Sequence, residues 1–204
     1  RQESTAKATI DIRTKDMEVL GVNLVELSDS QKVVIFPYDQ RIVVHQNRDF
    51  DFGGIVQSER FSLYGYDMDF NYDRFKINLN EIDSLQYQVA TGHVLPDGSP
   101  ILLPCKTVVQ EIKGALYVDS PKNKSGLKKY KKYPMLESID DSYVYYDKIK
   151  NGIYSKDLFS FRVDPFKITG LNDKETNKIR FPGHLQAPGI FPEFKEVLAL
   201  TEKR

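Results

Sequence analysis

Residues 50–79 read FDFGGIVQSERFSLYGYDMDFNYDRFKINL, and apolar side chains occupy alternate positions through most of this stretch. An alternation with a period of two is typical of a strand that buries one face and exposes the other. Asp, Asn and Gly separate the alternating runs, and the strand starts lie roughly nine residues apart. The stretch therefore predicts a series of short β-strands joined by tight turns.

The same alternation continues outside this stretch, for example from Ala8 to Ile12. The chain has 12 Tyr, 12 Phe and no Trp, and 12 Gly and 10 Pro interrupt it throughout. Aromatic residues suit a pleated, half-buried surface, whereas frequent Gly and Pro break long helices. With a length of 204 residues, the whole chain, 1–204, is predicted to be a single all-β domain. Only residues 191–200 also fit a helical stripe.

Two short patterns recur along the chain in the same order. The pattern apolar-x-Gly-x-apolar is centred on Gly54, Gly114 and Gly183, and aromatic-x-apolar-Asp-x-Phe-Lys-Ile ends at Ile77 and Ile168. Internal repeats of this kind are the sequence signature of stacked architectures. We therefore expect one unit at 50–90, a second at 108–172 and an incomplete third at 178–204. The interrupted third unit predicts that this chain is a fragment of a longer protein.

The repeats favour strand pairs that stack against one another, because a single pair cannot bury its apolar face alone. The stack would be solenoid-like, or it would close into a jellyroll or sandwich. Glycine weakens a strand unless another backbone approaches closely, so the repeated glycines predict such close contacts. A change of Gly54 or Gly183 to Val would then destabilise the fold by roughly 1–3 kcal/mol.

The second unit contains an insert, residues 119–158, that is rich in lysine and tyrosine. Long insertions in one repeat often carry binding surfaces. Lysines interleaved with aromatic residues suit a polyanion, and tyrosines alone suit sugar rings. The simpler alternative is a solvated loop whose charge is balanced by nearby acids. The candidate binding residues are Lys128, Lys129, Tyr130, Lys131, Lys132, Tyr133, Tyr143, Tyr145 and Tyr146.

The sequence shows no motif that carries catalysis. The 3 His residues are scattered, Cys105 is the one cysteine, and no zinc, calcium or phosphate-loop motif is present. Asp67 and Asp69 are two positions apart, which would place both on one face of a strand, and Glu81 and Asp83 lie on or beside strands nearby. Such carboxylates are more typical of the polar face of a sheet than of the catalytic pair of a glycosidase. We therefore expect no enzyme, no cofactor and no metal.

Charge and hydropathy narrow the classes of partner. Lys and Arg number 29 and Asp and Glu number 29, so the formal net charge is zero. A balanced charge gives no strong signal for nucleic acid. Apolar runs of four or five residues are far shorter than the about 20 that a spanning helix needs, so no transmembrane segment is expected. Asn123, Lys124 and Ser125 form a glycosylation sequon, which matters only in a eukaryotic secretory pathway.

Four stretches of the chain resemble a known group of proteins. They are Phe50–Leu85, Tyr143–Tyr146, Val163–Phe166 and Phe181–Phe194. They resemble segments of very long uncharacterised proteins of Bacteroidetes-type bacteria. The resemblance implies a location in the cell envelope or outside the cell, and it transfers no catalytic residue. The rhythm of residues 52–70 is also similar to the rungs of lipopolysaccharide-transport jellyrolls, which hold acyl chains in an open groove.

Three functions are compatible with these observations. The first is a non-catalytic structural or interaction module of a larger bacterial envelope or secreted protein, whose partners include other domains of the same chain. The second is a carrier that holds a lipid in a β groove, because the chain is rich in Phe, Tyr, Ile and Leu. The third is a carbohydrate-binding module that uses the tyrosines of the insert. The lack of Trp, which offers the largest stacking face, counts against the third.

Overall fold

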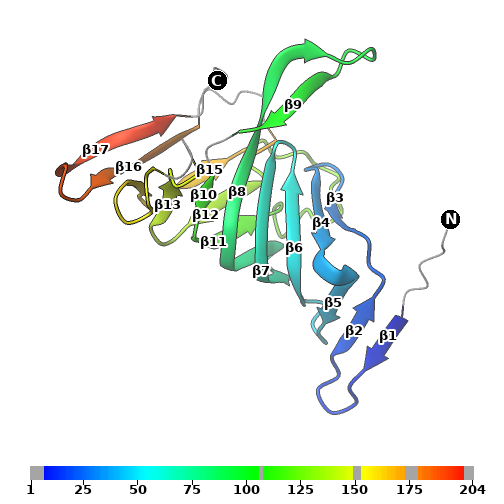
Figure 1. Cartoon of the computed structure of the whole chain (residues 1–204). Helices are drawn as coiled ribbons and strands as arrows, with labels where there is room; N and C mark the ends of the chain where they lie inside the picture. The colour runs from blue at the N-terminus through cyan, green and yellow to red at the C-terminus, as the bar shows by residue number, and fades with distance from the viewer. Residues whose placement is uncertain (1–6, 106–107, 149–152, 173–178, 200–204) are drawn as a thin grey trace.

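The structure is a computed structural model that describes residues 7–105, 108–148, 153–172 and 179–199. Within these ranges the chain forms 17 strands and one short 3-10 turn, and all the strand pairs are antiparallel. The strands form one sheet that does not close on itself (Figure 1). The all-β prediction is confirmed.

A three-stranded meander forms the centre of the sheet. It consists of β6 (Phe50–Ser58), β7 (Phe61–Asn71) and β8 (Lys76–Val94), which cover the alternating residues 50–79 and the positions directly after them. Apolar residues alternate on β6, where Phe50, Phe52 and Val56 are buried. The alternation therefore places one face of the meander in the core, as expected for period-two strands.

The N-terminal strands extend the sheet from the free edge of β6. This edge pairs with β4 (Val33–Pro37) along one part and with β5 (Arg41–Val44) along another. The 3-10 turn at Tyr38–Gln40 separates β4 from β5. The outer strands on this side are β3 (Val25–Ser28), β2 (Met17–Leu20) and β1 (Lys7–Ile10).

The sheet forks along the other edge of β8. This edge pairs successively with β11 (Ile112–Tyr117), β10 (Val109–Gln110) and β9 (Pro100–Pro104). One branch continues from β11 through β12 (Met135–Ser138) to β15 (Lys167–Thr169). The other continues from β10 through β13 (Ser142–Tyr145), β14 (Ser160–Val163), β16 (Arg180–Ala187) and β17 (Phe191–Ala199).

A single apolar core connects the meander with both branches. Its fully buried members include Ile77 of β8, Leu136 of β12 and Phe161 of β14. Phe166 and Phe181 pack edge to face with ring centroids 5.0 Å apart. Phe75, in the turn before β8, packs in the same way against Phe70 at 5.7 Å. Aromatic side chains thus fill the core on both sides of the fork.

The three glycines of the recurring pattern share one local geometry. Each lies on a strand, and a Cβ added to it would collide with the backbone carbonyl oxygen of an adjacent strand. In each case this oxygen belongs to the residue just before the glycine's cross-strand partner. Only glycine permits such a close approach of two backbones. The glycines are Gly54, Gly114 and Gly183, and the oxygens belong to Phe36, Glu137 and Arg162, respectively.

The alternative of a helix at residues 191–200 is wrong. Residues Phe191–Ala199 form β17, which pairs with β16 along most of its length. Backbone pairing with a neighbouring strand outweighs the weak helical spacing of the apolar side chains. Position 200 lies outside the described residues. No helix in the described ranges is long and apolar enough to cross a bilayer.

Candidate functional site

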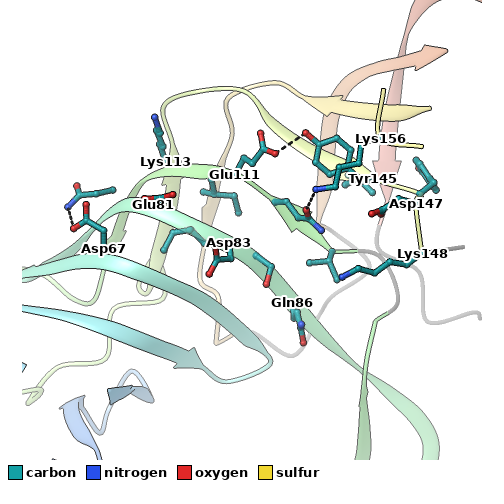
Figure 2. Close-up of a pocket in the computed structure, with 18 residues that line it drawn as sticks. Asp67, Glu81, Asp83, Gln86, Glu111, Lys113, Tyr145, Asp147, Lys148 and Lys156 are labelled. Atoms are coloured by element: carbon teal, nitrogen blue, oxygen red, sulfur yellow. Dashed lines mark hydrogen bonds between the residues drawn. The ribbon is translucent and has the colours of Figure 1, made fainter. Parts of the chain in front are cut away.

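A cavity of about 800 Å³ lies where β8 meets the two branches. Its lining comes from β7, β8, β10, β11 and β13 and from the segment that follows β13. Figure 2 shows charged side chains from several of these elements along the cavity, with Asp67 and Lys113 toward one end and Asp147 and Lys148 toward the other. We call this cavity the fork groove. Its charged lining residues are Asp67, Glu81, Asp83, Glu111, Lys113, Asp147, Lys148 and Lys156.

Irregular pairing of the strands creates the fork groove. The register between β7 and β8 shifts near Gly65 and Asp67, and the register between β8 and β11 shifts between Ile112 and Gly114. A bulge adds an unpaired residue and bends the strand, so that side chains leave the regular alternation. Asn80 and Glu81, which are consecutive on β8, are consequently both exposed. The carboxylate of Glu81 therefore faces the groove rather than the core (Figure 2).

Glu111 occupies the single position between β10 and β11. Its backbone has φ of +61°, in the left-handed region that residues other than glycine rarely adopt. Such strain persists only where the surrounding structure enforces it, and it often occurs at functional positions. The Glu111 Oε1 accepts a hydrogen bond of 2.9 Å from the Tyr145 hydroxyl group. This bond fixes the glutamate at the wall of the groove (Figure 2).

Tyr145 is packed between two other side chains. Its ring is nearly parallel to that of Tyr143, with centroids 5.7 Å apart and an angle of 8° between the planes. The Lys156 ammonium group lies 4.4 Å from the Tyr145 ring centroid, and it also contacts Gln110 Oε1 at 3.5 Å. Burial and the hydrogen bond to Glu111 raise the pKa of Tyr145 above its ordinary value. The Tyr145 hydroxyl group therefore keeps its proton and acts as a donor.

A second cavity, of about 510 Å³, shares Glu111, Tyr145 and Lys156 with the fork groove. These three residues therefore stand between the two spaces. Glu193 of β17 lines the far side of the second cavity, where it accepts hydrogen bonds from Gln186 at 3.0 Å and from Arg162 at 2.7 Å. The hydrogen bond from Gln186 and the positive charge of Arg162 lower the pKa of Glu193. The carboxylate is thus ionised at neutral pH.

The predicted binding residues fall into two separate places. Tyr145 and Tyr146 line the fork groove, and Tyr143 lines the second cavity with Tyr145. The residues of the lysine-rich segment line neither cavity. Within that segment Tyr133 is buried and Tyr130 is partly exposed. The exposed lysines there are Lys128, Lys129, Lys131 and Lys132.

A buried polar network holds the base of the lysine-rich segment. Asp119 is fully buried, and its Oδ2 accepts hydrogen bonds from Gln31 at 3.2 Å and Asn123 at 2.8 Å. Its Oδ1 accepts the backbone N–H of Ser120 at 2.6 Å. Asn123 also exchanges two hydrogen bonds with the backbone of Lys128. The sequon asparagine is therefore only 4% exposed, and its amide is engaged in the folded protein.

Sequence reasoning missed Glu111 and Lys156, because neither lies in a motif. It assigned Asp67, Glu81 and Asp83 to a polar sheet face, and the structure places all three at the wall of the fork groove. Asp67 is held at 3.4 Å by the Asn80 amide. The signal that could have indicated this site is the break in alternation around Gly65 and again around Glu81.

No group of three His, Cys, Asp or Glu side chains in the described ranges has an arrangement that would hold a metal ion. The histidines lie apart: His45 contacts Asp16 and Asp51, whereas His184 lies near Asp164. No family model, no curated protein and no solved structure matches this chain. The resemblance to long envelope proteins therefore stays a prediction.

Proposed function

We propose that this chain is a non-catalytic interaction module whose fork groove binds a neutral oligosaccharide. The observation that carries the proposal is the lining of the groove, where five carboxylates and three lysines lie along a cavity that Tyr145 and Tyr146 also line. Carboxylates accept hydrogen bonds from sugar hydroxyl groups, lysines donate to sugar oxygens, and tyrosine edges and faces contact the apolar side of the ring. A ligand with many hydroxyl groups fits this mixture.

The alternative of a lipid carrier receives less support. An acyl chain needs a cavity lined mainly by apolar side chains. The buried apolar residues lie instead in a packed core, where Ile77, Leu116 and Leu136 have no exposed surface. Charged groups surround the larger cavity. Insertion of an acyl chain there would remove several charges from water without pairing them, at a cost of several kcal/mol.

The chemistry of Tyr145 and Glu111 supports binding rather than catalysis. The pKa of Tyr145 lies above its ordinary value, so this hydroxyl group is poorly suited to act as a base near neutral pH. The tyrosine proton is directed to the Glu111 carboxylate. With this proton engaged, the tyrosine oxygen and the second carboxylate oxygen are fixed acceptors beside the groove, and they can orient a bound hydroxyl group that donates to them.

The scaffold around the groove is proposed to be built from repeated units. The common geometry of Gly54, Gly114 and Gly183 supports this view, because each glycine lets an adjacent strand approach in the same manner. Stacked units would leave loops free to vary; the groove would lie between the first and second units, and the second unit would carry the lysine-rich segment. A place in the bacterial cell envelope or outside the cell is part of the same proposal and rests on the resemblance alone.

A glycan array followed by calorimetry on the strongest neutral oligosaccharide tests the proposal. Glu111→Gln keeps the shape of the side chain but removes its charge, and it should weaken binding by about tenfold, the loss expected for one charge-assisted hydrogen bond. Tyr145→Ala should abolish binding. The matched control is Tyr66→Ala, because Tyr66 is 73% exposed and lines neither cavity.

Two results would contradict the proposal. The first is an array on which no neutral glycan binds the folded wild-type protein. The second is a glycan whose affinity is the same for wild type, Glu111→Gln and Tyr145→Ala. Thermal unfolding of each variant shows whether a lost affinity reflects the groove or the fold.

A further inference from the structure

The segment between β11 and β12 presents a second surface, separate from the fork groove. Residues 120–133 read SPKNKSGLKKYKKY and contain six lysines and no acidic residue. We call this segment the basic loop. A cluster of like charges in a flexible segment is ordinarily a solvated tail, so the degree of order of this loop decides what it can do.

The basic loop is held in place at several points. Its backbone forms turns through hydrogen bonds from Asn123 N–H to Ser120 O at 2.8 Å and from Gly126 N–H to Asn123 O at 2.9 Å. The network around Asp119 fixes the Asn123 side chain, and the Tyr133 ring is 8% exposed. The backbone carbonyl of Lys132 accepts the N–H of Gly170 at 3.0 Å. The lysines are therefore displayed by an ordered frame rather than by a random coil.

Most of the positive charge on the basic loop is not neutralised by the protein. Lys124 lies 3.9 Å from Asp73 and 4.0 Å from the Tyr72 ring centroid. Lys128, Lys129 and Lys131 are exposed, and no ion pair with them occurs in the described part of the chain. Within the described ranges, no carboxylate neutralises these three charges.

An exposed leucine lies in the middle of this charge. Leu127 is 88% exposed, the highest value among the large apolar side chains of the described ranges. It follows Gly126, whose φ of +66° makes a tight turn. Leu127 thus lies between Lys124 on one side and Lys128 and Lys129 on the other. A single exposed leucine needs no explanation, but a leucine at the turn of an ordered cationic loop has the composition of a membrane-surface anchor.

We propose that the basic loop docks this module on an anionic lipid surface, with Leu127 inserted at the level of the headgroups and the lysines paired with lipid phosphates. Lysines near such a surface are attracted by its negative potential, and the apolar side chain adds a short-range contribution. A nucleic acid fits less well. Base stacking needs several exposed aromatic faces, whereas Tyr133 is buried and Tyr130, at 39% exposed, is the one exposed ring of the loop. The loop also lacks the arginine that binds phosphate in a bidentate manner.

Sedimentation with vesicles measures this docking. The whole chain should bind vesicles that contain phosphatidylglycerol and should not bind vesicles of phosphatidylcholine alone. Added salt should weaken the binding, because surface charges are screened within about 10 Å at 0.1 M ionic strength. Joint replacement of Lys128, Lys129, Lys131 and Lys132 by Gln should lower the partition coefficient at least about tenfold. The charge-matched control replaces Lys7, Lys15, Lys167 and Lys195 by Gln, and it should retain most of the binding.

A second measurement reports on Leu127 itself. The chain has no Trp, so Leu127→Trp introduces a single indole fluorophore. Its emission should shift to the blue on anionic vesicles, because the indole leaves water. Ile190→Trp is the matched control, since Ile190 is 70% exposed at the turn between β16 and β17, and its emission should stay unchanged.

Three results would overturn the proposal. They are the absence of binding to anionic vesicles at low salt, unchanged binding after the four lysines are replaced, and an indole at position 127 that stays in water on bound vesicles. If instead the protein binds a short single-stranded RNA with the same lysine dependence and ignores vesicles, the partner is a polyanion. Binding of a glycan at the fork groove is a separate readout, and its failure would leave the vesicle results intact.

Discussion

The meander and the forked branches bury apolar side chains with strands of very different length. In the meander, β6, β7 and β8 have 9, 11 and 19 residues. Beyond the fork, β10 to β15 have between 2 and 6 residues. Long strands satisfy nearly all their backbone groups in the ladder, whereas short strands leave many such groups to loops.

This difference explains where the polar chemistry of the molecule lies. Loops between short strands need other partners for their backbone, and Asp119 and Asn123 provide them from buried positions. Interrupted pairing near Glu111 also opens the fork groove. Both the meander and the branches therefore contribute to the core, whereas the candidate binding surfaces lie where the strand pairing is interrupted. Substitutions in the two regions test whether regular and interrupted strand pairing differ in this way.

The repeated glycines should contribute equally to the stability of the meander and of the branches. Gly54→Val in the meander and Gly183→Val in the branches each place a side chain against a neighbouring backbone carbonyl, and each should lower the free energy of unfolding by about 3 kcal/mol. Denaturation with urea measures the loss. Gly98→Asn is the control, because an added Cβ at Gly98 would have open space around it. If Gly54→Val greatly lowered the free energy of unfolding and Gly183→Val did not, the two glycines would not be equivalent and the proposed repeat would lose support.

The buried network should stabilise the junction between the N-terminal strands and the branches. Asp119→Asn replaces one acceptor oxygen by an NH2 group that faces the amide donors of Gln31 and Asn123. We expect a loss of about 2 kcal/mol, because a buried hydrogen-bonding group is left without a partner. Thermal unfolding gives the total loss, and amide exchange shows which strands open first. Ser125→Ala in the same loop is the control, since Ser125 is exposed, and an equal loss there would argue against the network.

The sequence predicted the regular half of the molecule better than the irregular half. Alternation over residues 50–79 indicated the strands of the meander, because one buried face imposes a period of two. The prediction of short strands there was wrong, since the expected runs merge into β7 and β8, which have 11 and 19 residues. The spacing around the recurring glycines indicated close backbone contacts, which Gly54 and Gly183 show. These signals are local, so one sequence is enough to read them.

The buried network and the fork groove could not be predicted in the same way. Gln31 and Asp119 are 88 positions apart, and nothing local indicates that they meet. The left-handed backbone at Glu111 also has no signal, since the usual marker for such a position is glycine or asparagine. Tyr143 and Tyr145 were predicted to bind a ligand, but their partner Lys156 is brought to them by tertiary structure alone.

Two glutamates with left-handed backbones allow a direct comparison of the regions. Glu59 lies in the turn between β6 and β7, with φ of +48°, and Glu111 lies at the fork, with φ of +61°. At each site the Gly variant should be more stable than the Ala variant by about 1 kcal/mol, because glycine relieves the left-handed strain. Only the changes at Glu111 should weaken glycan binding. A loss of binding from the Glu59 variants would show that the groove depends on the whole sheet.

The smallest effect concerns the N-terminal edge. His45 contacts Asp16 at 2.8 Å and Asp51 at 3.0 Å, and the hydrogen bond to Asp16 is the main cause that raises the pKa of His45 above 6.5. The pKa of Asp16 is lowered below 3.8 by the same bond. Because folding raises the pKa of His45, protonation of His45 stabilises the folded state. This contribution is fully present below pH 6.5 and is lost as pH rises through the pKa of His45 in the folded protein. A lowered aspartate pKa contributes above pH 3.8 and is lost in more acidic solution.

The contact between His45 and Asp16 should therefore be strongest between about pH 4 and pH 6.5. Amide exchange in β1 and β2, corrected for intrinsic base catalysis, should become at most about fivefold faster at pH 8, since exposed ion pairs contribute little. His45→Gln should remove this dependence. If the variant keeps the same pH profile, another group controls the edge.

The buried network around Gln31 also has a consequence for the time course of synthesis. Gln31 donates to Asp119, 88 positions later, and its Oε1 accepts from Asn172, 141 positions later. A ribosome that adds about 5–20 residues per second needs roughly 7–28 seconds to travel that distance. During this interval the meander can assemble, while the polar groups of Gln31 remain in water. The network is thus complete only once Asn172 has been added, and a nascent chain arrested before Asn172 should remain accessible to proteases at its N-terminal side.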